Sequence, residues 1–454
     1  MATARGELRS AMAGVLLLVA FTVPAQGQQG TPAGVPVLTL DAALALAIQG
    51  NVALADATLG VTKATASVGA ARTRHLPSLI LEAGANYSFN RQGFTVPAGE
   101  FGTYPIVGPI PDSSTTIQSI DGPYGAASAS VTQPVLQLHR IGLMVNQFEL
   151  EESLAEQELR GRRQEVVKQV RQQYYEMLKT QSALDAAVTS VAFYQALVAL
   201  VQQYVAQEVA QEYEAMETRA RLARSEYTVR RETNALLTQQ ERFNNLLGRD
   251  PATRFRVEEQ VPAPIGYPPL AQAESLAIAQ RPDVQARGLR MQQAETGYRL
   301  TKAEYLPDLN VFMKYSQLVN VDFVPATDWS VGLQFRWDIY DWGRKSQDLQ
   351  KKRAEVAQAE NELAHTKAQV SIEVAARLRD VTQAEELVKV TELTRQAATE
   401  KLRVLTNEYR EQDALLKDVL QAESELADAN NEYQRALLSF WTAQAELDKA
   451  LGGT

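Results

Sequence analysis

Two very long stretches of this chain contain no proline, and they limit its fold more than any other feature. They run from Val135 to Asp250 and from Ala326 to Thr454. Proline ends helices because it lacks a backbone donor and clashes with the preceding turn, so a proline-free run can remain helical. Both stretches are rich in Ala, Leu, Glu, Gln, Lys and Arg, which favour helix. The sequence therefore predicts helices far longer than the roughly 11–12 residues usual in globular domains.

Apolar residues recur at every seventh position in the second stretch, in two separate series. A sustained apolar repeat of this kind is the seam of a coiled coil. Aromatic residues make up only 7% of the chain, which favours closely packed helices over a thick globular core. The first series is Leu349, Val356, Leu363 and Val370, and the second is Val419, Leu426, Tyr433, Phe440 and Leu447.

The composition excludes several functions. A net charge of −9 disfavours nucleic acid as a partner, because binding phosphate requires a basic surface. Without cysteine the chain has no disulfide, no thiolate metal site and no cysteine for a lipid anchor. The histidines His75, His139 and His365 lack the spacing of metal ligands, and no hydrolase motif occurs. We therefore expect no metal, no cofactor and no enzymatic activity.

The N-terminus has the three parts of a secretory signal peptide, which we place at residues 1–27. Arg5 and Arg9 precede an apolar stretch from Ala11 to Val23, and a small-residue cleavage site follows. The apolar stretch is shorter than the ~20 residues of a membrane-spanning helix. An uncleaved anchor is the alternative. We expect an exported chain in which no other stretch crosses a membrane as a helix.

The chain contains a tandem repeat, with copies at about 28–260 and about 261–454. The first two pairs of matching residues given below lie 230 positions apart and the last two lie 204 apart. We assign the difference to a longer loop in the first half, roughly Gly93 to Pro123. The pairs are Leu46 and Leu276, Pro77 and Pro307, Arg140 and Arg344, and Gly248 and Gly452.

Each repeat contains two stretches of alternating apolar and polar residues, which predict β-hairpins at about 78–136 and about 308–341. The alternation is clearest from Trp329 to Ile339, where apolar residues occupy every second position. Such strands, with aromatic residues near their ends, are typical of an outer-membrane β-barrel. An amphipathic hairpin on a soluble core fits the same pattern, and the export signal favours the barrel.

The predicted helix lengths agree between the halves. The apolar period lapses at about 204–213 and about 407–413, which divides each proline-free run into a helix of about 65 residues and a returning helix of about 35. A helix of about 35 residues, Asp41 to Arg74 in the first half, opens each repeat. Two of these end to end equal the long helix, about 100 Å at 1.5 Å per residue. Each half is thus predicted to be a pair of antiparallel rods with a hairpin at one end.

Such a chain needs copies of itself. Four strands cannot close a barrel, and lipid does not tolerate open sheet edges. Three copies would supply about 12 strands, an even number within the usual range. The predicted fold is therefore a long antiparallel α-helical coiled-coil barrel joined to a 12-stranded trimeric β-barrel, to which each chain of two tandem repeats gives four strands.

The order of these motifs resembles the TolC family of outer-membrane efflux channels. The resemblance rests on the strand entries Leu76–Leu79 and Leu306–Leu309, on Asp338–Arg344, and on the closing Leu247-Gly248 and Leu451-Gly452. It implies a homotrimer with its barrel in outer-membrane lipid and its helical tunnel across the periplasm. It further implies a periplasmic adaptor protein and an inner-membrane pump as partners, and efflux of small molecules as the activity.

The resemblance also implies a gate of carboxylate rings at the periplasmic tip. Asp418 stands where the family has the first aspartate of its tip motif, while Gln421 replaces the second. The corresponding positions in the first half are Glu214 and Glu217, which share a helix face at this spacing. The alternative for these carboxylates is an ordinary solvated helix face.

Aromatic residues have two predicted roles. Tyr409 matches a family tyrosine that holds the closed tip, although the arginine that assists it in the family is replaced by Ala414. Others are expected at the membrane interfaces, where Trp and Tyr collect, with core packing as the alternative. These are Trp329, Trp337, Trp342, Tyr87 and Tyr315.

Two other functions fit the sequence. One is the exit duct of type I protein secretion, since the docked pump and not the tunnel selects the substrate. The other is a periplasmic coiled-coil scaffold without a pore, which the strand alternation from Trp329 to Ile339 opposes.

Overall fold

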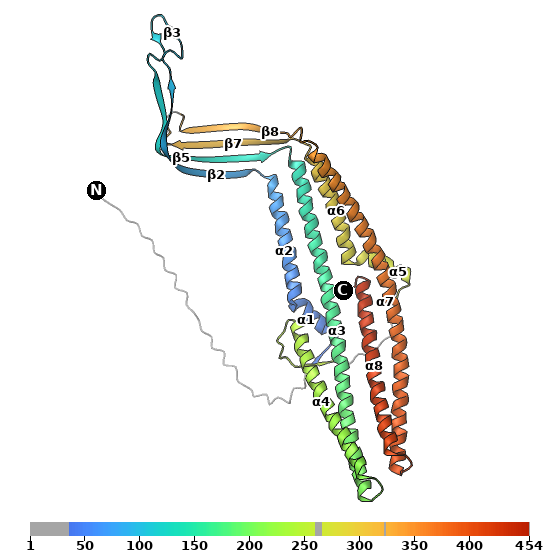
Figure 1. Cartoon of the computed structure of the whole chain (residues 1–454). Coiled ribbons are helices and arrows are strands. Elements are labelled where there is room, and N and C mark those ends of the chain that lie inside the picture. The colour runs from blue at the N-terminus through green and yellow to red at the C-terminus, as the bar shows by residue number, and fades with distance from the viewer. Residues whose placement is uncertain (1–35, 259–265, 322–323, 454) are drawn as a thin grey trace, which may run out of the picture.

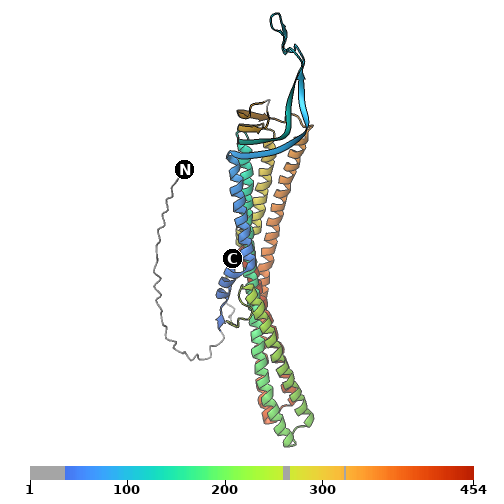
Figure 2. The ribbon, with the colours of Figure 1, turned by 90° about the vertical axis from the view of Figure 1, so that its left-hand side faces the viewer.

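The computed structural model describes residues 36–258, 266–321 and 324–453, so the signal peptide expected at residues 1–27 lies outside the described range. The chain consists of long helices and a four-stranded sheet. The helices that precede and follow the strands lie side by side below the sheet (Figure 1). Viewed from the side, the molecule is a narrow rod, as expected for a chain without a globular core (Figure 2).

Two helices of nearly equal length form the main rods, α3 (Leu138–Ala206) and α7 (Arg344–Glu411). Each turns back at its lower end in Figure 1 into a return helix, α4 (Glu212–Leu246) or α8 (Leu416–Ala450). Several members of the seven-residue series are buried where neighbouring helices pack, those of α8 at the tip and at mid-length and Val370 of α7 beside the opening helices of the second half. The buried members are Val370, Val419, Phe440 and Leu447.

The opening helix of the first half is broken in two, which corrects the single helix expected from Asp41 to Arg74. The pieces α1 (Leu40–Gly50) and α2 (Val52–Arg72) meet at a bend of 45°. Asn51 causes the break, because its side chain accepts hydrogen bonds of 2.9 and 3.3 Å from the first backbone N–H groups of α2.

The second half has the same break with a different cause. Helix α5 (Leu270–Gln280) ends before Arg281, and α6 (Pro282–Ala303) begins with a proline. Proline cannot continue a helix but suits its first position, where the missing N–H would be unpaired anyway. Helical propensity alone therefore overestimated the length of both opening helices.

The return helices end against these breaks. Gly248, which follows α4, has a φ of +71°, and a Cβ there would lie 2.0 Å from the carbonyl oxygen of Gly50. Asn51 donates from Nδ2 to the carbonyl of Leu246 (2.9 Å). Gly452 after α8 has a φ of +88°, and a Cβ there would lie 2.8 Å from the Cβ and 3.1 Å from the carbonyl carbon of Gln280. The repeated Leu-Gly endings thus allow backbone contact between a return helix and a helix break.

Tyr174 of α3 fixes the segment beside the first junction. Two short strands, β1 (Val37–Leu38) and β6 (Arg256–Val257), pair there in parallel. The hydroxyl of the fully buried Tyr174 lies 3.1 Å from the carbonyl oxygens of Leu38 and Glu258 and accepts from the N–H of Glu258 (3.0 Å). Burial raises the pKa of Tyr174 to about 12, so it remains a donor at physiological pH.

The long strands form one antiparallel sheet in the order β2–β5–β7–β8, which joins the two halves. Their bounds are β2 Ser78–Val96, β5 Thr115–Pro134, β7 Asp308–Val319 and β8 Thr327–Arg336. Residues directly opposite each other lie on the same face of a sheet. The register therefore gathers the alternating apolar residues on one face, which this chain leaves exposed. One row across it is Leu79, Val131, Met313 and Val331.

The first hairpin is longer than predicted. Both ends of the loop expected from Gly93 to Pro123 are strand, because β2 continues to Val96 and β5 begins at Thr115. Register shifts between Ser88 and Gly93 accommodate the segment that composition assigned to a loop. The short pair β3 (Thr103–Tyr104) and β4 (Gly108–Pro109) lies beyond.

The last strand is shorter than predicted. The alternation predicted a strand as far as Ile339, whereas β8 ends three residues earlier, at Arg336. The partner strand β7 begins at Asp308, opposite Arg336, and Pro307 before it has no N–H to donate. Trp337 therefore lies at the junction of sheet and helices.

Helix α3 corrects a further expectation, that no stretch beyond the N-terminus has the composition of a membrane helix. Within the described residues one segment of α3, at about 184–201, is long and apolar enough, with a mean hydropathy of 1.7. Only 22% of this segment is buried in the single chain. Its buried members, among them Tyr194, Leu197 and Val201, pack in the tip between the helix pairs.

We expect Gly248→Ala to lower the free energy of unfolding by at least about 2 kcal/mol, because it combines a left-handed backbone with a clash against Gly50. Gly60→Ala is the matched control. A Cβ at this position meets no atom within 4 Å, and the substitution replaces a glycine that weakens the helix. Thermal unfolding of the purified protein measures both. Equal melting temperatures for the two variants would contradict the proposed junction.

Candidate gate at the helical tip

Both turns between long and return helices lie at the end of the molecule farthest from the sheet (Figure 1). The α7–α8 turn begins at Gln412, whose φ of +68° reverses the chain, and the α3–α4 turn contains Glu208 with a φ of +56°. Left-handed residues of this kind end helices. One apolar cluster holds the two turns together. Its buried members are Tyr194, Leu197, Val201, Tyr204, Ala215, Tyr409, Leu416, Val419 and Leu420.

Tyr409, predicted to hold the closed tip, is buried at the centre of this cluster. Its ring meets Tyr204 of α3 edge to face, with centroids 5.7 Å apart. The Tyr204 hydroxyl donates to the carbonyl of Arg410 (3.0 Å), so this pair connects the end of α3 to the end of α7. Burial raises the pKa of Tyr409 to about 12, and the charge of Glu214 adds to the shift. Ala414 is partly buried against the same cluster and offers no polar group.

Glu214 and Asp418 occupy equivalent places in the two repeats, the third position of a return helix. Glu214 accepts a hydrogen bond from the N–H of Gln211 (3.0 Å) and completes a capping box at the start of α4. Asp418 lies in the first turn of α8, whose preceding residue Leu415 provides no side-chain cap. A carboxylate at either place is favoured by the partial positive charge of the helix N-terminus. Both therefore stabilise their helices whether or not they line a pore.

Glu217 and Gln421, the next pair along, are exposed and bonded within their own helices. Glu217 pairs with Arg221 at 3.4 Å, and the Gln421 amide donates to Glu425 at 3.1 Å. Surface pairs at this spacing contribute only about 0.3–0.5 kcal/mol, so they do not fix the tip. Among the described residues, the structure brings Tyr409 and Glu214 close together but gives no contact between Asp418 and Glu217.

A buried polar network, which sequence reasoning missed, connects the two helix pairs above the tip. Glu423 of α8 accepts hydrogen bonds from Ser190 (2.9 Å) and from the Tyr194 hydroxyl, both on α3. Glu423 is only 8% exposed. Burial raises the pKa of Tyr194, and the hydrogen bond to Glu423 raises it further, while Arg221 of α4 opposes the shift. A buried carboxylate is tolerated only with such partners, so the network fixes α8 against α3.

One signal could have revealed Glu423. It follows Val419 by four residues and precedes Leu426 by three, which places it on the apolar seam of α8. A charged residue on a coiled-coil seam needs a partner. The partners Ser190 and Tyr194 carry no comparable signal, since they come from a distant helix.

The predicted interface aromatics lie at two levels, one at the helix-distal end of the sheet and one where the sheet joins the helices. Tyr315 and Trp329 lie opposite each other at the helix-distal end, with ring centroids 4.7 Å apart. Tyr87 on β2 packs against Phe89 and is exposed as well. The alternative of core packing under the sheet does not describe these residues in the single chain, where Trp329 is 69% exposed.

The other two tryptophans lie at the junction with the helices. Trp337 donates from Nε1 to the carbonyl of Tyr305 (3.1 Å), and Trp342 meets Tyr340 edge to face at 5.1 Å. Trp342 is 89% exposed. Trp329 and Trp337 are separated by at most about 26 Å along the strand, at about 3.3 Å per residue, which is about 20 Å of height at the 35–45° tilt of barrel strands. The apolar band of a membrane barrel is about 25 Å tall.

An exposed apolar sheet face between two aromatic levels, carried on long helical rods, defines a class of protein: channels of the outer membrane. The chain belongs to the family described as "Outer membrane efflux protein", which matches residues 43–249 and 274–453. The two matched segments confirm the tandem repeat and the family that the motifs resembled. Members of this family are channels and not enzymes, and the family places the chain in the outer membrane.

Solved structures share this fold at low sequence identity. The channel protein CusC matches with a TM-score of 0.75 at 15% identity, over 91% of this chain and 92% of its own. VceC from Vibrio cholerae matches with a TM-score of 0.70 at 18% identity, over 91% and 96%. The CmeC outer membrane channel of Campylobacter jejuni matches with 0.74 at 15%, over 91% and 85%. At these identities the likeness establishes the fold alone, and no curated protein sequence matches the chain.

We expect alkaline conditions to loosen the tip through Tyr409. Its pKa is about 12 in the folded tip and about 10 when unfolded, so the folded state binds the proton more tightly. The resulting stabilisation is complete below pH ~10 and is lost as the pH rises towards ~12. Hydrogen exchange of tip amides across this range should show a smaller pH dependence in Tyr409→Phe than in the wild type. An unchanged pH dependence would contradict the assignment.

Tyr194→Phe should loosen α8 from α3. The substitution leaves the buried Glu423 carboxylate without its strongest donor, at a cost of about 1–3 kcal/mol. Tyr227→Phe is the matched control, because Tyr227 is 65% exposed on α4 and should change stability by less than about 0.5 kcal/mol. Hydrogen exchange in the first half of α8 measures the effect. Equal exchange in the two variants would rule out the network as a connection between the helix pairs.

Proposed function

We propose that three copies of this chain form a continuous conduit through the outer membrane and periplasm. The observation that carries the proposal is the sheet with one exposed apolar face and two unpaired edges, β2 and β8. In lipid an unpaired edge leaves backbone groups without partners, at several kcal/mol each. Pairing β8 of one copy with β2 of the next removes every edge, and three copies give about 12 strands, within the range of known barrels.

The helices support the same assembly. The segment of α3 at about 184–201 has the hydropathy of a membrane helix yet is only 22% buried in one chain. Apolar surface of this extent calls for neighbouring helices. A ring of three chains would supply them and would continue the barrel as a helical tunnel. We take the tunnel to end at the tip turns, where an adaptor protein and an inner-membrane pump would dock.

The gate in this proposal is the closed tip. The contacts Tyr204–Tyr409 and Tyr194–Glu423 hold the α7–α8 pair against the α3–α4 pair. Opening requires the α7–α8 pair to move away from the α3–α4 pair, because in a trimer three closed tips would meet at the central axis of the tunnel. Asp418, with Glu214 and Glu217, would then place rings of carboxylate at the tunnel mouth, where charged rings attract cations. The substrates we assign are small molecules, and the docked pump selects them.

Asp418→Ala should weaken the block of single-channel current by divalent cations, raising the blocking concentration about tenfold, since the Asp418 ring would lose all three of its charges. Asp428→Ala is the control, because Asp428 is exposed on the same helix, 13 residues after Leu415 at the end of the tip turn. Currents across planar bilayers measure the block. An effect no larger than that of Asp428→Ala would remove Asp418 from the gate.

Assembly and substrate are tested separately. The purified protein should migrate as a heat-modifiable trimer from outer-membrane detergent fractions, whereas a soluble monomer would favour a scaffold without a pore. Deletion should increase sensitivity to small toxic compounds. A secreted proteome that loses specific proteins, with sensitivity unchanged, would favour the exit duct of type I secretion.

A further inference from the structure

The elements follow one another in the same order at three levels of the chain. The order is β2–β5–β7–β8 in the sheet, α2–α3–α6–α7 between the sheet and mid-length, and α4–α3–α8–α7 towards the tip (Figure 1). One flank of the molecule is therefore formed by β2, α2 and α4, and the opposite flank by β8 and α7. A contact between copies that begins at the sheet edges would continue down these helices.

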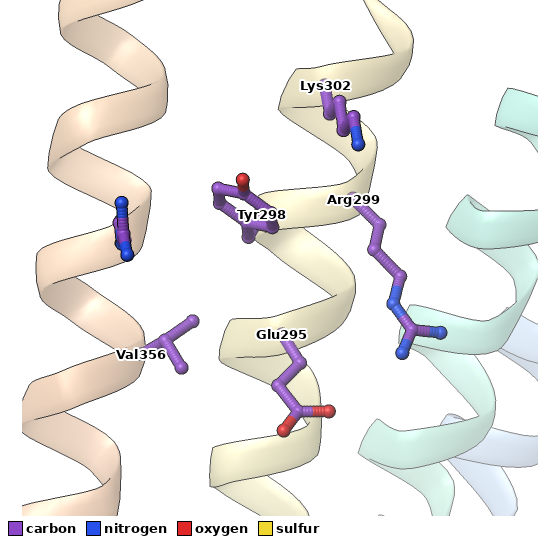
Figure 3. A pocket seen from close by; sticks show the side chains of 6 residues that line it. Glu295, Tyr298, Arg299, Lys302 and Val356 are labelled. Carbon is purple, nitrogen blue, oxygen red and sulfur yellow. The ribbon is translucent and has the colours of Figure 1, made fainter.

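Helix α7 directs one face into its own chain. Figure 3 shows Val356 of α7 pointing toward α6, on the side of Tyr298. Further down, Val370 is buried beside α5 and α6, and Tyr409 is buried in the apolar cluster of the tip. This face is therefore occupied within the single chain, and the opposite face of α7 forms the flank.

The flank of α7 carries a second apolar stripe, formed by Val390, Ala397 and Val404 at intervals of seven residues. Val390 is 60% exposed and Val404 is 38% exposed in the single chain. At about 100° per residue, the stripe lies roughly 120–140° around the helix from the buried Ala384 and Tyr409. Apolar side chains in such a stripe call for a further helix beside α7.

The opposite flank has a matching stripe on α4. Tyr213, Ala220 and Tyr227 recur at intervals of seven residues, and both tyrosines are 65% exposed. The stripe lies on the side of α4 away from the buried Ala215 and Ser225. Helix α4 thus has one apolar seam inside the chain and a second one that this chain leaves uncovered.

The two stripes lie at the same depth and fit each other in size. Tyr227 follows the first residue of α4 by 15 positions, and Ala397 precedes the last residue of α7 by 14. Ala220 and Val404 lie eight and seven positions from the same ends. Because α4 leads away from the tip and α7 leads toward it, the two helices would pair antiparallel. In each facing pair a large side chain then meets a small one, which lets helices approach closely.

The helices nearer the sheet fit in the same way. Val52 and Leu59 of α2 are 77% and 66% exposed. They precede the last residue of α2 by 20 and 13 positions. The exposed residues Ala364 and Ala357 follow the first residue of α7 by the same numbers of positions. Large residues on one flank again fall opposite small residues on the other.

We propose that a second copy of this chain covers each flank, with α7 of one copy packed antiparallel against α2 and α4 of the next. Ala220 would face Val404 of the next copy, and Leu59 would face Ala357. Two different flanks that fit each other make a head-to-tail contact, which closes into a ring when the rotation allows it. The inference rests on the proposed function, since it continues the pairing of β8 with β2 between copies. This seam would close the tunnel wall, because each chain supplies only part of it.

Disulfide formation in the full-length oligomer tests the seam, because the chain has no cysteine of its own. Ala220 and Val404 lie on opposite flanks of one chain, so the variant A220C/V404C can form this disulfide only between copies. Facing residues of packed helices bring their Cα atoms within the roughly 4.4–6.8 Å that a disulfide requires. After mild oxidation and heating without reductant, most of the protein should run as covalent two-chain and three-chain species. The variant L59C/A357C should do the same.

The variant A220C/V390C is the matched control, because Val390 lies on the same stripe but about 21 Å further along α7. It should remain single-chain. Equal crosslinking of this control would show random collision and overturn the seam. Covalent dimers of V404C alone would show that like flanks meet, which also overturns it.

Two further outcomes separate this inference from the proposed function. Full reaction of the A220C thiol with a maleimide in the intact trimer would leave the stripe uncovered and free for another protein, which overturns the seam. A trimer that conducts but forms no disulfide in A220C/V404C or L59C/A357C overturns this inference alone. The absence of any trimer overturns the proposed function with it.

Discussion

The one-sided apolar sheet is the constraint on which the rest of the structure depends. Its register aligns Leu79, Val131, Met313 and Val331 across four strands that come from both halves of the chain. The strand order also fixes the order of the helices, because α2 and α6 enter the sheet and α3 and α7 leave it. This exposed face and the two unpaired edges are the features from which we propose a barrel shared by several chains in lipid.

At the opposite end, stability and function make different demands on the same contacts. The tip is held by an aromatic pair and by a buried carboxylate with hydroxyl donors, Tyr204–Tyr409 and Tyr194–Glu423. Fully bonded polar groups of this kind specify one arrangement, but they lose much of their stability when a partner moves away. In the proposed gate, opening would break these contacts, so a partner that opens the tip would have to bind the separated helix pairs more tightly than the closed ones.

The two places where a return helix ends against a break in an opening helix explain why the halves share their Leu-Gly endings. In each half a glycine after the return helix contacts a break in the opening helix, Gly248 against Gly50 and Gly452 against Gln280. The repeat itself was predictable from the matching residues. The breaks were not, because Asn51 and Pro282 interrupt segments whose overall propensity is helical, and local capping outweighs propensity at single positions.

The sequence by itself determined the long rods, the tandem repeat, the alternating strands and the family, because these depend on period and order along the chain. It also indicated Tyr409 and Asp418 as tip residues. Only the tertiary structure decided which distant residues meet: that Glu423 of α8 contacts Tyr194 of α3, and that Tyr204 of α3 packs on Tyr409 of α7. Contacts between helices far apart in the chain depend on how the rods align, and no local pattern of residues encodes that alignment.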